Sequence, residues 1–507
     1  MNLFKRLLLA VLAPVVFLAA VEIILRAAGY GYPTAFFVPA EINGRKVLTD
    51  NQFFGYRFFP PRITRTPPCI VLDREKKPDA VRVFVLGESA AMGEPLDGFG
   101  VARQLACLLE SRYPGKRFEV VNAAMTAINS HVIVEIAREA ARLQPDVFVL
   151  YIGNNEVVGP YGPGTVFDAF SGSRFVTRAR VLATRLRLAQ LLRSLMKSSA
   201  DRACGTDEWE GMEMFAERQV PADDPRLDSV RRQFRANVGE ILRIAGRAGA
   251  EVALCTVAVN LRDCPPFAGP DASALYSNAC ALEAAGDVDK AREAFKAARD
   301  RDTLRFRADR AINEILREIG SSGRPGLQFV DAERVFQDAG ASGIPGEDYF
   351  LDHVHFNFAG NYVLALNIAE AAAGLAALRG EPPRESPALS GCRDILLYTV
   401  WDELELTDLS LQRMRRPPFR DQPGSAARIE ALIRHKASLQ DSARSVNLDE
   451  LRPHYLQAMQ AHPDDWFYPA GWGAILNDGN LYEESERCFR TALALAPMAL
   501  TARYTRI

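Results

Sequence analysis

Short, nearly continuous apolar runs alternate with amphipathic stretches over residues 80–380. The first run, VRVFVLG at 81–87, is followed by a stretch with helical periodicity at about 98–113. Apolar runs of this length are typical of parallel strands that helices bury on both faces. We therefore predict an α/β domain over residues 80–380, built as a three-layer parallel sheet. Further elements of the same pattern are apolar runs at 118–123, 146–153, 251–259 and 327–332, and a helix over 131–143.

Two segments have the spacing of paired helices rather than of strands. Residues 272–301 place Ala291, Phe295 and Ala298 on one stripe. Residues 390–507 follow the proline-rich boundary GEPPRESP and have an α-helical pattern throughout. Both segments resemble tetratricopeptide repeats, which bury little surface as isolated units. We therefore expect the insertion and the C-terminal α-helical region to dock on the domain, and the repeats to offer a surface for a protein partner.

The N-terminal segment has the pattern of a membrane-targeting sequence. Basic residues precede an apolar run over residues 7–25 that only Glu22 interrupts. This run approaches the ~20 residues that a spanning helix needs, so we predict a transmembrane anchor at 1–27 with the remaining chain outside the cytoplasm, periplasmic or extracytoplasmic. A cleaved signal peptide is the alternative. Residues 28–79 lack helical periodicity, and we expect an extended lead-in.

Composition narrows the function classes. With 507 residues, 48% of them hydrophobic and 24% charged, the chain is typical of a globular protein with more than one core. A formal net charge of -2 supplies no basic field, so we expect no nucleic-acid partner. The eight cysteines include no CxxC pair, and we predict neither a metal nor another cofactor. A disulfide among Cys204, Cys255, Cys264 and Cys280 stays open.

A candidate nucleophile follows the first apolar run. The segment Gly87-Glu88-Ser89-Ala90 passes from the predicted strand into a helix, where backbone donors can face the Ser89 hydroxyl. Strand-to-helix turns also contain glycine and serine for conformational reasons alone. A catalytic role for Ser89 therefore depends on partners elsewhere in the chain.

Two further motifs offer such partners. In Asp352-His353-Val354-His355, an aspartate three residues before a histidine can accept from one ring nitrogen while the other faces a serine. In Gly153-Asn154-Asn155-Glu156, an asparagine amide after a predicted strand can donate to a developing oxyanion. A metal bound by His353 and His355 is the weaker interpretation, because no third ligand has a recognisable spacing.

Together the three motifs resemble those of the SGNH/GDSL hydrolase family, over about residues 80–375. The family's Gly-Asp-Ser block is similar to Gly87-Glu88-Ser89, which implies that Ser89 is the nucleophile. Its Asp-x-x-His block is matched by Asp352 and His355, which implies the orienting and proton-transfer roles. His353 has no counterpart in that block.

The same resemblance implies an oxyanion hole formed by Ser89, Ala127 and Asn155. The family's Gly-x-Asn-Asp block resembles the segment 153–156, so Asn155 takes the amide role. Its glycine block has Ala127 at the equivalent position, with Ala124 as the alternative. Glu88 and Glu156 stand where the family has aspartate.

The resemblance implies hydrolysis of an ester through an acyl-serine intermediate, with an acylated small molecule, envelope glycan or lipid as substrate. An O-acyltransferase with the same triad is an alternative, because water and an alcohol attack the same intermediate. A non-catalytic envelope scaffold that binds partners through its helical repeats is the other. Because every motif lies before residue 356, we expect the region beyond residue 381 to lie outside the catalytic site.

Overall fold

The central feature of the computed structural model is a five-stranded parallel sheet with the strand order β5-β4-β6-β7-β8. The structure describes residues 3–200, 209–340 and 342–498. The α/β architecture expected from the apolar runs is present. Its strands are β4 (Ala80–Gly87), β5 (Arg117–Asn122), β6 (Val147–Tyr151), β7 (Glu251–Cys255) and β8 (Leu327–Val330).

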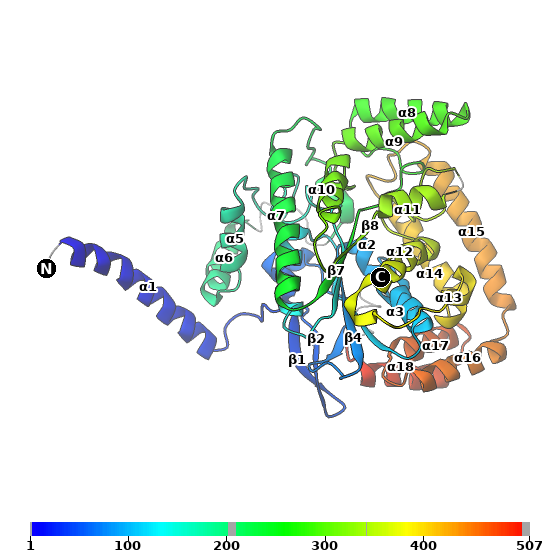
Figure 1. Cartoon of the computed structure of the whole chain (residues 1–507), viewed down its shortest axis with the longest axis horizontal. Coiled ribbons are helices and arrows are strands. Elements are labelled where there is room, and N and C mark those ends of the chain that lie inside the picture. Colours follow the sequence, from blue (N-terminus) through cyan, green and yellow to red (C-terminus); the bar gives the residue numbers. More distant parts are fainter. Residues whose placement is uncertain (1–2, 201–208, 341, 499–507) are drawn as a thin grey trace.

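Helices cover both faces of this sheet (Figure 1). On one face α3 (Val101–Arg112) packs against α12 (Phe358–Ala371). On the other, α4 (Ser130–Ala140) and α10 (Arg310–Gly320) pack against α7 (Arg226–Arg247). All residues of β4 and β6 are buried, which explains why these strands are nearly continuous apolar runs instead of alternating ones.

The lead-in over residues 28–79 contains extended strands. It forms a separate antiparallel sheet of β1 (Phe37–Ile42), β2 (Arg45–Asp50) and β3 (Val71–Asp73). The buried Arg57 guanidinium bonds the Glu135 carboxylate of α4 at 2.9 Å and so ties the lead-in to the α/β domain. A buried charge needs such a partner.

The predicted transmembrane anchor is wrong. Residues Leu3–Ala27 do form a helix, α1, which projects from the body of the molecule (Figure 1). Yet across the described parts of the chain, no helix combines the length and the apolarity that crossing a membrane requires. Glu22 interrupts the apolar run with a charged side chain. Its carboxylate accepts hydrogen bonds from the backbone N–H groups of Arg187 and Leu188 at 3.0 and 2.8 Å. These groups begin α6 (Arg187–Ala200), so the end of α1 is fastened to that helix.

The insertion and the C-terminal region are helical. The pair α8 (Pro270–Ala284) and α9 (Val288–Arg301) packs together and buries the predicted stripe of Ala291, Phe295 and Ala298. The resemblance of both segments to tetratricopeptide repeats stays a prediction. The C-terminal helices are α13 (Leu389–Ile395), α14 (Val400–Met414), α15 (Ser425–Ser445), α16 (Leu448–Ala461), α17 (Phe467–Asp478) and α18 (Tyr482–Leu495). The other helices are α2 (Ser89–Met92), α5 (Arg174–Ala183) and α11 (Ala332–Ala339).

The C-terminal helices dock on α3 and the loop before it. The ring of Phe467 lies edge-on to Phe99 at 5.1 Å between centroids and under the Arg103 guanidinium at 4.3 Å. Arg103 also bonds Asp465 at 2.6 Å. This region is therefore packed against the α/β domain rather than joined to it by a free linker.

The cysteines that we considered for a disulfide are unpaired where the structure describes them. Cys255 and Cys264 are buried thiols and Cys280 is exposed. Cys204 lies outside the described residues.

Candidate active site

Three neighbouring strands deliver candidate residues to one edge of the sheet. Ser89 follows β4, Ala127 lies in the loop after β5, and Asn155 lies in the turn after β6. Because β5, β4 and β6 are adjacent and parallel, the segments that follow their carboxyl ends emerge side by side. The three residues line one cavity.

Asp352, His355 and Ser89 form a continuous hydrogen-bonded chain. His355 Nε2 lies 2.8 Å from Ser89 Oγ, and His355 Nδ1 lies 2.7 Å from Asp352 Oδ2. The other oxygen of Asp352 accepts the backbone N–H groups of Val354 and His355, both at 3.0 Å, which holds the carboxylate against its own turn. With Nδ1 protonated, Nε2 is free to accept the serine proton.

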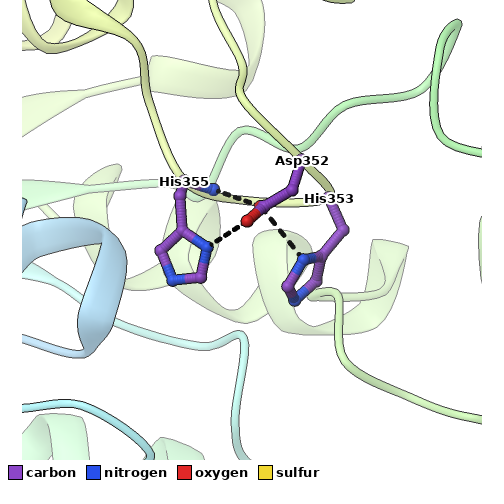
Figure 2. A group of neighbouring side chains, drawn as sticks. All are labelled: Asp352, His353 and His355. Carbon is purple, nitrogen blue, oxygen red and sulfur yellow. Dashed lines mark hydrogen bonds and ion pairs between the residues drawn. The ribbon is translucent and has the colours of Figure 1, made fainter. Parts of the chain in front are cut away.

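His353 contacts the same carboxylate from the other side. Figure 2 shows Asp352 between the two histidines, with His353 Nδ1 3.0 Å from Oδ1. Its ring packs among Phe267, Phe306 and Phe419. Burial lowers the pKa of His353 to about 4, so this imidazole is neutral at neutral pH.

The charges around His355 set the protonation of the site. Burial disfavours the imidazolium, but the contacts with the Asp352 and Glu94 carboxylates together outweigh burial and raise the pKa of His355 above its usual value. For Asp352, burial opposes ionisation, while His355, His353 and Arg413 together hold its pKa well below the usual range. Asp352 therefore stays ionised, as an orienting partner of the histidine must.

Ala127 has a backbone conformation that favours glycine. Its φ is +61°, in the left-handed region where a Cβ atom adds strain. This explains why the motif resemblance has glycine here. Alanine is the smallest side chain that can replace it.

Two buried glutamates brace the turn that carries Asn155. Glu88 accepts the backbone N–H groups of Gly153, Asn154 and Asn155 at 3.1, 2.8 and 3.3 Å. Glu156 accepts the N–H and hydroxyl of Ser130 at 2.8 and 2.7 Å, and burial raises its pKa to about 7. Glu88 and Glu156 thus fasten the turn after β6 to neighbouring segments.

The Asn155 side chain is oriented by one of its own hydrogen bonds. Its Nδ2 donates to the carbonyl oxygen of Ile128 at 3.1 Å, in the loop that carries Ala127. An amide nitrogen has two N–H groups, so a second donor remains for a ligand. Asn155 lines the cavity alongside Ser89.

The cavity over Ser89 has a volume of about 590 Å³ and is closed in part by the C-terminal helices. This differs from the expectation that the region beyond residue 381 lies outside the site. The reason is the docking of α14 and α17 over the loops at the end of the sheet. The lining residues from this region include Glu405, Leu409, Arg413, Phe419, Trp466 and Phe467.

Sequence reasoning missed two charged residues beside His355. Glu94 Oε2 lies 3.4 Å from His355 Nε2, and Arg65 Nη2 bonds the other oxygen of Glu94 at 3.2 Å. Arg413 bonds Asp352 Oδ2 through Nη1, which also lies 2.8 Å from His355 Nδ1. Neither residue belongs to a motif, and no sequence signal marks either of them.

The arginines of residues 302–309 have structural roles. Arg307 bonds Asp302 at 3.1 Å and the carbonyl oxygens of Asn260 and Cys264 at 3.0 and 2.8 Å. Arg305 donates to the carbonyl of Val220 at 2.9 Å. Both guanidinium groups are buried away from the cavity, so neither is placed to hold a substrate anion.

The cluster of Asp352, His353 and His355 brings ligand atoms within 4.8 Å of one another. Both ring nitrogens of His355 already have hydrogen-bond partners, and Arg413 supplies a positive charge at the carboxylate. A metal ion would displace these contacts. The donor set therefore fits a proton-transfer site better than a metal site.

No protein-family model matches the chain, and no curated protein matches it. Among solved structures, the chain is similar to a catalytic mutant of Axe2, an acetylxylan esterase from Geobacillus stearothermophilus, with 13% identity and a TM-score of 0.30. That match covers 61% of this chain and 99% of the other. A second Axe2 mutant, described as an acetyl-xylooligosaccharide esterase from Geobacillus, matches with 14% identity and a TM-score of 0.29, over 59% and 95%. At these scores the likeness assigns no activity to the chain.

Proposed function

We propose that this protein hydrolyses an ester through an acyl-serine intermediate on Ser89. The observation that carries the proposal is the chain of contacts from Ser89 Oγ to His355 and on to Asp352, at 2.8 and 2.7 Å. A hydroxyl is a poor nucleophile until a base takes its proton. In its neutral form, His355 can take this proton through Nε2.

In the first half of the reaction, His355 Nε2 takes the Ser89 proton as Oγ attacks the ester carbonyl carbon. The negative charge that develops on the carbonyl oxygen faces the backbone N–H groups of Ser89 and Ala127 and the Asn155 amide. The intermediate collapses, the bond to the alcohol oxygen breaks, and His355 returns the proton to the departing alcohol. The acyl group stays on Ser89.

In the second half, water takes the place of the alcohol. His355 accepts a proton from the water as its oxygen attacks the acyl carbon, and then returns that proton to Ser89 Oγ. The products are the free acid and the restored enzyme. The cavity is larger than an acetyl group needs, which leaves room for the alcohol part of an acylated small molecule or glycan.

Labelling with a fluorophosphonate tests the proposal without knowledge of the substrate. We expect covalent modification of the full-length protein at Ser89, confirmed by peptide mass, and none in Ser89→Ala. Hydrolysis of an activated acetyl ester should follow the same pattern. A folded protein that neither reacts with the probe nor cleaves such esters would contradict the proposal and favour a binding role.

A further inference from the structure

We propose that Arg413 is a positioning residue that keeps His355 available as the base, so that the C-terminal helix α14 supplies part of the catalytic apparatus. This inference rests on the proposed function. Its starting point is the pair of contacts that Nη1 of Arg413 makes with Asp352 Oδ2 and His355 Nδ1. Two hydrogen-bond donors, the Arg413 Nη1–H and the His355 Nδ1–H, thus converge on one carboxylate oxygen.

The imidazole of His355 lies between two buried carboxylates. Asp352 faces Nδ1 at 2.7 Å and Glu94 faces Nε2 at 3.4 Å. Two negative charges at these distances in a buried site would strongly favour the imidazolium. A histidine held in that form could not accept the proton of Ser89.

Each carboxylate has its own arginine. Arg413 contacts Asp352, and Arg65 bonds Glu94 at 3.2 Å. Two carboxylates and two guanidinium groups sum to zero charge, so the arginines offset the preference for the imidazolium that the carboxylates create. The positive charge of Arg413 lowers the pKa of His355 and thereby offsets part of the effect of Asp352.

The remaining groups around His355 do not replace this charge. His353 is neutral because burial lowers its pKa to about 4, and Ser89 carries no charge. The other charged residues that line the cavity are Asp97, Glu210, Glu405 and Arg416, whereas the ion pairs of His355 are with Asp352 and Glu94. Besides its two histidine neighbours, Asp352 thus has the guanidinium of Arg413 in contact with it as a permanent positive charge.

Contacts at the two ends of α14 hold Arg413 in place, although 61 residues separate it from Asp352 in the sequence. Helix α14 begins with a capping box in which Thr399 and Asp402 exchange hydrogen bonds, which fixes its first turn. Phe419, just beyond the helix, packs on the His353 ring at 5.6 Å. The Arg413 side chain is 27% exposed and lines the cavity, so it can respond to a bound ligand.

The pH dependence of labelling at Ser89 tests the role. Fluorophosphonate labelling rates are measured from about pH 5 to about pH 9 for the full-length protein and for R413Q, R413K and R415Q. For R413Q we expect the acid limb to move to higher pH, with a loss of roughly tenfold at neutral pH and little loss at alkaline pH. R413K keeps the charge and should keep most of the wild-type profile. Arg415 is exposed and outside the cavity, so R415Q should match the wild type.

A second variant checks the charge balance. Glu94→Gln in the R413Q background removes one negative charge, and we expect it to return the acid limb toward its wild-type position.

Equal loss at every pH in folded R413Q would mean that Arg413 only packs, and an unmoved acid limb would also overturn the inference. Proton NMR titration of the histidine rings in wild type and R413Q gives the same comparison without any reaction. If the wild type is not labelled at all, the proposed function fails, whereas the titration still decides the role of Arg413.

Discussion

His355 Nε2 lies 2.8 Å from Ser89 Oγ, although 266 residues separate the two in the chain. One residue comes from the turn after β4 and the other from the turn before α12. The sheet and α12 therefore bring a base within reach of a hydroxyl. This relationship makes the proposed chemistry testable by substitution.

We expect Ser89→Ala and His355→Ala each to remove nearly all ester turnover, because members of a triad act as a unit. His353→Phe should retain activity within about tenfold, because its ring packs among aromatic side chains and contacts Asp352 but not Ser89. The measurement is kcat/KM on an activated acetyl ester, with thermal unfolding as the control for folding. A loss in His353→Phe as large as that in His355→Ala would move the base to the other histidine.

Asn155→Ala is predicted to lower kcat by about 10² to 10³ with little change in KM, because the amide acts on the charge of the transition state. Asn155→Asp is the matched variant, since it keeps the shape but replaces the donor with an acceptor. It should be at least as damaging. An effect of either change on KM alone would remove Asn155 from the oxyanion hole.

The left-handed conformation of Ala127 predicts opposite results for two substitutions. Ala127→Gly should leave kcat nearly unchanged, because glycine adopts a φ of +61° without strain. Ala127→Val should lower both kcat and stability, the latter by about 1 to 3 kcal/mol, because a branched side chain is poorly tolerated there. Steady-state kinetics and chemical unfolding of both variants give the comparison. Full activity in Ala127→Val would show that this N–H is not needed.

Because the C-terminal region docks on the loop before α3, we predict that substitutions at Gly98 and Phe467 have coupled effects. A Cβ atom added at Gly98 would collide with the Phe467 ring. Gly98→Ala should therefore lower the melting temperature and the ester turnover, because it displaces α17 from the cavity wall. The same change in a Phe467→Ala background should cost much less. Additive effects in this double-mutant cycle would show that the two residues do not meet in solution.

His131 predicts a loss of stability in acid. Burial lowers its pKa to about 3, whereas the unfolded value is about 6.5. Between these values the unfolded chain binds a proton that the native protein does not, so stability falls as pH drops, by up to about 1.4 kcal/mol per pH unit. His131→Asn can still accept from Asn237, which lies 3.1 Å from Nδ1 in the native protein. We expect a shallower slope of unfolding free energy against pH for this variant between about pH 4 and 6.

The sequence by itself determined the sheet and where the candidate site lies along the chain. Runs such as VRVFVLG and DVFVLYIG are nearly continuously apolar because helices bury both faces of the strands that they form. The spacing of Asp352 and His355 is local, so one turn is enough to bring their side chains together. Their catalytic roles, and that of Ser89, stay predictions.

Tertiary structure alone decided what surrounds that site and what the N-terminal helix contacts. Arg413 reaches Asp352 from 61 residues away because α14 docks over the sheet edge, and Glu94 reaches His355 because its loop folds back. Such contacts result from many packing interactions between distant segments, and packing has no period that a sequence displays. The prediction of a membrane anchor at the N-terminus was wrong for a related reason. The hydrophobicity of the run can be read from the local sequence, whereas the contacts of Glu22 with α6 depend on a segment 165 residues away.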